Sequence, residues 1–173
     1  AKRLATASAD GVINMWDTLT GRLQTSIKGH AGAINQIAFS PNGKWLATAG
    51  DDGAAKLWEI GKGAEEVLRL TGHNAKVRGI AFSPDGKQLA TSGYDATVRL
   101  WSLATLRFGL PLAVLDEGPG APITYALAFS PDGKRLAAGR VDGTVVIWSI
   151  TPLEKKLGFQ ADESAIFSVA FSR

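Results

Sequence analysis

Apolar and polar residues alternate over short runs along the whole chain, and tight-turn sequences separate these runs. Within residues 33–60, the first run ends at the sequence SPNG (40–43), typical of a type I turn, and the second ends at DDG (51–53), typical of a hairpin turn. A third run follows at 56–58 and a fourth at 65–70. Because period-two alternation is typical of half-buried strands, this stretch predicts four short antiparallel β-strands.

This unit recurs along the chain. The string AFSP, any residue, then GK occurs at 38–44, 81–87 and 128–134, and a shortened copy ends at residue 172. One tryptophan follows in each unit, at Trp16, Trp58, Trp101 and Trp148. The longest interval between them contains DEGPG (116–120), which is typical of an enlarged loop. We divide this single domain into units at about 1–28, 29–71, 72–118 and 119–160, with a final first strand at 161–173.

The repeat predicts an all-β fold, a β-propeller of about four antiparallel four-stranded blades with sixteen strands. A four-stranded sheet cannot bury both of its faces alone, whereas radial repetition packs each sheet against its neighbours. Helix is expected only as short turns near residues 104–107 and 152–155.

Closure of the propeller has three alternatives, because the chain opens in a second strand, Lys2–Ser8, and ends in a first strand, Ser164–Ser172. Pairing these strands within one chain closes a four-blade ring. Exchanging them between two chains builds a homodimeric eight-blade ring. In the third alternative, which we favour, neighbouring blades of a longer chain cover the open flanks.

Three registered motifs give the chain a family resemblance. A Gly-His pair precedes a strand at 29–30 and 72–73, an aspartate occupies the second hairpin turn of every unit, and a Trp-Asp or related pair follows it. The turn aspartates are Asp10, Asp52, Asp95 and Asp142. With these motifs the chain resembles the WD-repeat (WD40) β-propeller family over its whole length.

The resemblance implies a buried hydrogen-bonded tetrad of His, Ser/Thr, Asp and Trp in a blade. Carried over residue by residue, the first tetrad is His30, Thr48, Asp52 and Trp58, and the second is His73, Thr91, Asp95 and Trp101. Such a network satisfies polar groups that burial would otherwise leave without partners. We expect these eight residues to be structural.

The other two units depart from the tetrad pattern. The histidine position aligns with Asp116 and Asp162, and Ala138 stands where the fourth unit needs a hydroxyl. The first unit keeps Thr6, Asp10 and Trp16 but has no histidine before it. We therefore expect two complete networks and two incomplete ones.

The amino-acid composition limits which catalytic and metal-binding sites the chain can form. The chain has no cysteine and only two histidines among its 173 residues, so thiolate metal sites and thiol nucleophiles are excluded. A His–hydroxyl–Asp set is also found in hydrolases, but here it recurs with a tryptophan, and no G-x-S-x-G sequence occurs. We expect no enzyme activity, no catalytic residues, no metal and no cofactor.

Charge and hydropathy limit the partners. The net charge is only +3, so nucleic-acid binding, which would use basic residues such as Lys76, Arg78, Arg99 and Arg107, is not expected. No apolar run approaches the roughly 20 residues that span a bilayer. We expect a cytoplasmic protein without membrane contacts.

Partner-binding positions follow from register against the repeated phenylalanine. The residue four positions before this phenylalanine lies at the entry of the innermost strand, which in the resembled family faces the upper rim of the central channel. We add the residue two positions earlier and the residue before the turn aspartate. The rim residues, as we call the selected set, are Asn35, Asp51, Lys76, Arg78, Tyr94, Tyr125 and Phe167. Tyr and Arg are enriched at binding hot spots. The alternative role for Tyr125 and Phe167 is packing between inner strands. Trp45 lies at the opposite end of the blades, where it is either a second partner contact or a packing residue.

These observations predict a non-catalytic scaffold that binds a peptide or protein segment at the rim of the propeller. The alternative keeps the fold and makes the segment the sensor or regulatory part of a larger bacterial multidomain signalling protein, of the kinase or nucleotide-binding switch type. An enzyme that uses the central channel is a third, less favoured hypothesis, which the fold alone does not exclude.

Overall fold

The described part of the computed structural model, residues 3–61, 63–104, 111–115, 118 and 120–172, contains fifteen strands and no helix. The first sheet is three-stranded, with β1 (Arg3–Ala7), β2 (Val12–Asp17) and β3 (Leu23–Lys28). The second has β4 (Ile34–Phe39), β5 (Trp45–Gly50), β6 (Ala55–Ile60) and β7 (Ala64–Leu70). The third has β8 (Val77–Phe82), β9 (Gln88–Gly93), β10 (Val98–Ser102) and β11 (Ala113–Leu115). The fourth has β12 (Thr124–Phe129), β13 (Arg135–Arg140), β14 (Thr144–Ile150) and β15 (Leu153–Gln160).

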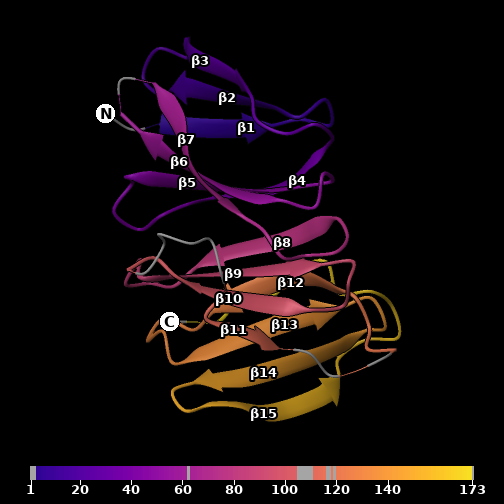
Figure 1. Ribbon diagram of the computed structural model, residues 1–173. Coiled ribbons are helices and arrows are strands. Elements are labelled where there is room, and N and C mark those ends of the chain that lie inside the picture. The colour runs from indigo at the N-terminus through magenta and orange to yellow at the C-terminus, as the bar shows by residue number, and fades with distance from the viewer. Residues whose placement is uncertain (1–2, 62, 105–110, 116–117, 119, 173) are drawn as a thin grey trace.

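The four sheets follow one another in chain order, from indigo β1–β3 to yellow β15 (Figure 1). Every sheet is an antiparallel meander of consecutive strands. The leading strands β4, β8 and β12 lie side by side, so they form the inner side of the arrangement. This order confirms the prediction of propeller blades.

The first hairpin turn of each full blade satisfies its own polar groups. Ser40 Oγ donates to Asn42 Oδ1 (2.7 Å) and accepts from the N–H of Trp45 (2.9 Å), while Asn42 Oδ1 accepts from the N–H of Lys44 (3.0 Å). Gly43 has φ of +67°, which favours glycine at this position. The SPDG turns at 83–86 and 130–133 repeat these bonds with aspartate in place of asparagine. The turn sequence therefore fixes the register of the hairpin.

Neighbouring blades bury their apolar faces against each other. Between the first two sheets, Ile13 and Met15 of β2 meet Leu46 and Trp58 of the second blade. Similar clusters form around Trp101, between the second and third sheets, and around Trp148, between the third and fourth. Trp58, Trp101 and Trp148 thus belong to the buried core, whereas Trp16 is only partly buried.

The predicted sixteenth strand is wrong, because residues 161–172 form no strand. The N–H of Ile166 donates to Arg140 O (2.9 Å), and the equivalent bond joins Ile34 of β4 to Ser8 O of the preceding blade (3.2 Å). The segment therefore occupies the place of the innermost strand of a next blade, but among the described residues no second strand pairs with it. The strand β1 pairs only with β2, so the described sheets form an open arc that fits a partial propeller.

The predicted helical turn at 152–155 is also wrong, since a turn there leads directly into β15. The other predicted turn, at 104–107, lies largely outside the described residues. Among the residues described, none belongs to a helix long and apolar enough to cross a membrane.

The outer strand β15 shows what the open arc leaves uncovered. By strand register, Phe159 corresponds to Leu70 of β7, and Leu157 corresponds to Leu68. Leu70 is 1% exposed against the third blade, whereas Phe159 is 45% exposed. The flank of the fourth blade thus presents apolar side chains that earlier blades bury.

Candidate functional site

A β-bulge at the start of each innermost strand positions the centre of the candidate site. The pairing register shifts between Ile34 and Gln36 in β4, and the same shift recurs in β8 and β12. The residues that the shifts leave unpaired are Asn35, Arg78 and Tyr125. Because a bulge re-aims the side chain of the extra residue, these three rim residues leave the regular alternation of their strands.

The polar rim residues form one hydrogen-bonded chain between the second and third blades. The amide of Asn35 donates to Asp51 Oδ1 (2.8 Å) and to Val77 O (2.9 Å), and its Oδ1 accepts from Arg78 Nη1 (3.1 Å). Lys76 Nζ donates to Asp51 Oδ2 (2.5 Å). The structure thus brings four of the predicted residues into direct contact.

The aromatic rim residues continue this network into the fourth blade. The ring of Tyr125 lies 6.0 Å from that of Tyr94 and 5.5 Å from that of Phe167, with the latter pair stacked at 19°. The guanidinium carbon of Arg78 lies 5.4 Å from the Tyr125 ring centroid. Phe167 is 70% exposed and Tyr94 is 41% exposed, so part of this aromatic surface is open to solvent.

The charges of the rim residues follow from these contacts. Hydrogen bonds from Lys76 and Asn35 lower the pKa of Asp51, and the bond to Asp51 raises the pKa of Lys76. A hydrogen bond with Tyr94 raises the pKa of Tyr125. At neutral pH Asp51 is therefore a carboxylate and Tyr125 is neutral.

A cavity of about 190 Å³ opens beside these residues. Asn35, Gln36, Arg78 and Tyr125 line it, together with the segment at 167–169. Gln36 is held by accepting the N–H of Ile80 (3.0 Å) through its Oε1. Arg78 is the one charged side chain among the described residues that line this cavity.

The two tetrads place their members in hydrogen-bonding distance. Trp58 Nε1 donates to Thr48 Oγ1 (3.0 Å), the hydroxyl meets His30 Nε2 (2.7 Å), and His30 Nδ1 meets Asp52 Oδ1 (2.8 Å). The same set in the third blade joins Trp101, Thr91, His73 and Asp95 at 2.8–3.0 Å. Both imidazoles are buried and both of their nitrogens are engaged, so neither histidine is placed to move a proton for a substrate.

Burial and hydrogen bonding act in opposite directions on these groups. Burial lowers the pKa of His30 and outweighs the opposing bond to Asp52. Burial would raise the pKa of Asp52 and Asp95, but hydrogen bonds from their histidines and from backbone N–H groups lower it. Neutral imidazole with Nδ1–H donating to a carboxylate is the state that satisfies this network.

The first and fourth units depart from the tetrad as their residue types imply. Trp16 Nε1 donates to Thr6 Oγ1 (2.9 Å) at an exposed site, and Asp10 binds Ser8 of its own turn. In the fourth blade Ala138 is buried where the hydroxyl would stand. Asp162 accepts the N–H of Ser164 (2.8 Å) in a local turn, and Asp116 lies outside the described residues.

Two buried cations beside the tetrads were missed by sequence reasoning. Lys56 is 5% exposed; its Nζ donates to Gly29 O (2.5 Å) and pairs with Glu66 (3.0 Å). Arg99, at the equivalent position, lies 3.8 Å from Asp95 and has a largely buried side chain. Each lies two residues before the tetrad tryptophan, so aligning the repeats would have placed both cations at the same position of the blade. Arg99 is therefore not part of a basic surface, and Arg107 lies outside the described residues.

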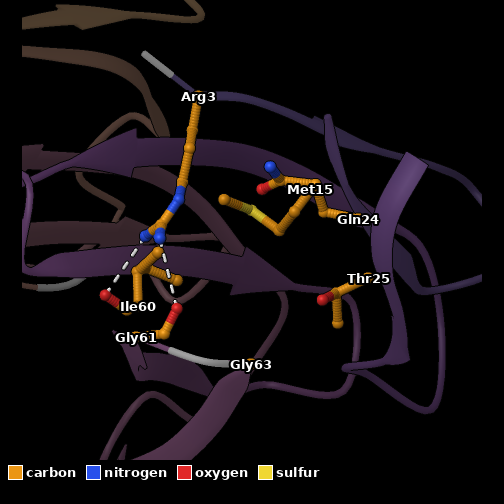
Figure 2. A pocket seen from close by; sticks show the side chains of 7 residues that line it. All are labelled: Arg3, Met15, Gln24, Thr25, Ile60, Gly61 and Gly63. Carbon is orange, nitrogen blue, oxygen red and sulfur yellow. Dashed lines mark hydrogen bonds between the residues drawn. The ribbon is translucent and has the colours of Figure 1, made fainter. Parts of the chain in front are cut away.

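Other features of the described residues offer fewer groups for binding a ligand. A cavity of about 230 Å³ between the first two blades is crossed by Arg3, which donates to Ile60 O (3.3 Å) and Gly61 O (3.2 Å) (Figure 2). Trp45 is half-buried against the core, with Lys44 Nζ 4.7 Å from its ring centroid. Among the residues described, no group of three or more His, Cys, Asp or Glu side chains is placed to hold a metal ion.

Comparison with known proteins adds family membership to this geometry. The family described as "WD domain, G-beta repeat" matches residues 21–59, 64–102 and 109–149, more than half of the chain. The nuclear distribution protein PAC1 of Arthroderma benhamiae is 39% identical over 57 residues, which cover 33% of this chain and 12% of that protein.

Two further relatives are similar over segments of the same size. The small ribosomal subunit protein RACK1 of Caenorhabditis elegans is 37% identical over 60 residues (35% of this chain, 18% of that protein). The WD repeat-containing protein 26 homolog of Arabidopsis thaliana is 40% identical over 58 residues (33% and 10%). The matched part of the chain thus spans less than a fifth of the length of these three relatives.

Proposed function

Because the chain belongs to the WD40 repeat family, we propose that it is a non-catalytic scaffold that binds a peptide or protein segment at the rim residues. WD40 repeat proteins are generally protein-interaction scaffolds and are typically non-catalytic. A cytoplasmic location and the absence of nucleic-acid binding stay predictions from the sequence.

The convergence of the rim residues carries this proposal. Bulged residues from three different blades line one cavity together with the exposed Phe167, which follows the fourth blade and stacks on Tyr125. Arg and Tyr contribute most often to binding hot spots, and here they are pre-positioned around a cavity. Such a surface offers a rigid site, because the blades below it are tightly packed.

Selection from a random peptide library displayed on phage tests the proposal. Peptides that the chain enriches are then measured against Arg78→Ala, Tyr94→Ala and Tyr125→Ala. We expect each variant to weaken binding by about tenfold or more, equal to about 1.4 kcal/mol. Circular dichroism and thermal melting should change little.

The exposed Arg135 at the opposite end of the fourth blade offers a matched control. Arg135→Ala should bind like the parent chain. If the three rim variants also bind like the parent, the rim is not the binding site.

A second candidate keeps the fold and makes this chain the sensor or regulatory segment of a larger multidomain signalling protein. The exposed Leu157 and Phe159 favour this candidate, because the equivalent residues of the second blade, Leu68 and Leu70, are partly and fully buried. Immunoblotting of the source cells with an antibody against these 173 residues reports the size of the polypeptide that carries them. A band at 18.2 kDa alone contradicts this candidate.

A further inference from the structure

Arg78 is held in place from two sides. Its Nη1 donates to Asn35 Oδ1 (3.1 Å), and its guanidinium carbon lies 5.4 Å from the ring centroid of Tyr125. The two bonds from the Asn35 amide, to Asp51 and to Val77 O, fix which way its oxygen points. The guanidinium thus has its position before any ligand arrives, which reduces the entropy that binding costs.

The positive charge of Arg78 is not matched by a carboxylate in contact. Asp51, the acidic rim residue, uses one oxygen for Asn35 and the other for Lys76. Among the described residues, no carboxylate lies within salt-bridge distance of Arg78. The rim residues therefore carry one excess positive charge, and it is located on a planar group with several N–H donors left for a ligand.

An apolar platform lies directly beside this charge. Tyr125 stacks with Phe167 and also faces Arg78, so the ring is shared between the charged and the apolar parts of the site. The exposed face of Phe167 and the adjoining cavity leave room for a side chain. A ligand that satisfies both parts needs an anionic group and an apolar group a few ångströms apart.

From this arrangement we infer that the rim residues select a peptide segment in which Asp or Glu stands beside an apolar or aromatic side chain. The carboxylate pairs with Arg78 through two N–H groups, and the apolar side chain packs on Tyr125 and Phe167. A basic peptide would be repelled by the excess charge. A nucleic acid would find a single unpaired cation where it needs several phosphate contacts.

The inference rests on the proposed scaffold function and deepens it, so the test must separate the two. The enriched phage peptides are sequenced, and each Asp or Glu is replaced by Asn or Gln in synthetic copies. We expect acidic residues next to apolar ones to be enriched. The amide replacement should cost about 10- to 100-fold in affinity, which is the range for a charge-assisted hydrogen bond.

Arg78→Gln and Phe167→Ala separate the two halves of the site. Arg78→Gln should bind the acidic and the amide peptides equally, because the group that distinguishes them is gone. Phe167→Ala should weaken both peptides by a similar factor and keep the preference for the acidic one. Arg135→Gln is the matched control and should retain the affinities of the parent.

Three outcomes overturn the inference. Enriched peptides without acidic residues, whose binding Tyr125→Ala still abolishes, refute the acidic preference and leave the scaffold function standing. A preference for acidic peptides that persists in Arg78→Gln refutes the role of Arg78. Enrichment of no peptide, together with binding of single-stranded oligodeoxythymidylate that Arg78→Gln abolishes, refutes both the inference and the proposed function.

Discussion

Thr48→Val tests whether the tetrad stabilises the blade through hydrogen bonds. Valine keeps the branched shape of threonine but removes the hydroxyl that accepts from Trp58 and meets His30. Thr48 is fully buried, so both partners would lose their bond without access to water. Leaving a buried polar group unsatisfied costs about 1–3 kcal/mol, and the added methyl group returns roughly 0.8 kcal/mol.

The net loss in the free energy of unfolding is therefore about 1–5 kcal/mol. A loss of about 3 kcal/mol corresponds to a fall in Tm of roughly 6–12 °C for a chain of this size. Urea unfolding followed by tryptophan fluorescence and by far-ultraviolet circular dichroism measures it.

The first blade supplies the control for this experiment. Thr6 accepts from Trp16 in the same way, but the site is exposed and no histidine joins it, so water replaces the lost bond. Thr6→Val should cost less than about 0.5 kcal/mol. If Thr48→Val unfolds at the same urea concentration as Thr6→Val, the tetrad does not stabilise the blade and the reasoning is wrong.

Three further predictions concern the same networks. His73→Ala should lower the free energy of unfolding by about 1–3 kcal/mol, because Thr91 and Asp95 lose their buried partner; an unchanged Tm contradicts this. Gly93→Ala should destabilise by about 1–3 kcal/mol, since a Cβ would lie 2.7 Å from His73 Nδ1 and from Asp95 Oδ1; a melting curve identical to the parent's contradicts the close approach. Stability should fall as the pH falls. Because the folded pKa of His30 is lowered, the free energy of unfolding begins to decrease below the unfolded pKa of about 6.5. The lowered pKa values of Asp52 and Asp95 add a second decrease below about pH 4. Urea midpoints from pH 7 to pH 3 measure this, and a flat profile contradicts it.

The blades themselves could be predicted from the sequence because their signals are local. The SPDG-type turns close over four residues, and the period-two alternation between turns assigns the core face directly. The tetrad members follow from the resemblance to the WD40 repeat family, once the repeats are placed in register with its motif. The stacking of Tyr125 on Phe167 was harder to predict, because the separation of the two rings depends on how two blades pack.

Three features required the folded chain. Nothing in the residue types of Asn35, Arg78 and Tyr125 signals a bulge, because each occupies an apparently regular position in an alternating run. The residue type of Lys56 does not indicate burial, which Gly29 O and Glu66 balance in the folded chain. The apolar alternation of residues 164–172 predicted a strand, but a strand also needs a backbone partner, and local patterning does not reveal whether one is present.

The self-satisfied turns have a consequence for how the chain folds. Each Ser-Pro-Asn/Asp-Gly turn meets its hydrogen bonds within six residues, so it forms without help from any distant part of the molecule. Hairpins with such local contacts form in about 1–10 μs, long before non-local packing is complete. We therefore expect the first two strands of each full blade to pair early and transiently, because an isolated two-stranded hairpin is only marginally stable in water. We expect the slow steps of folding to be the non-local contacts that join one blade to the next and make these hairpins stable.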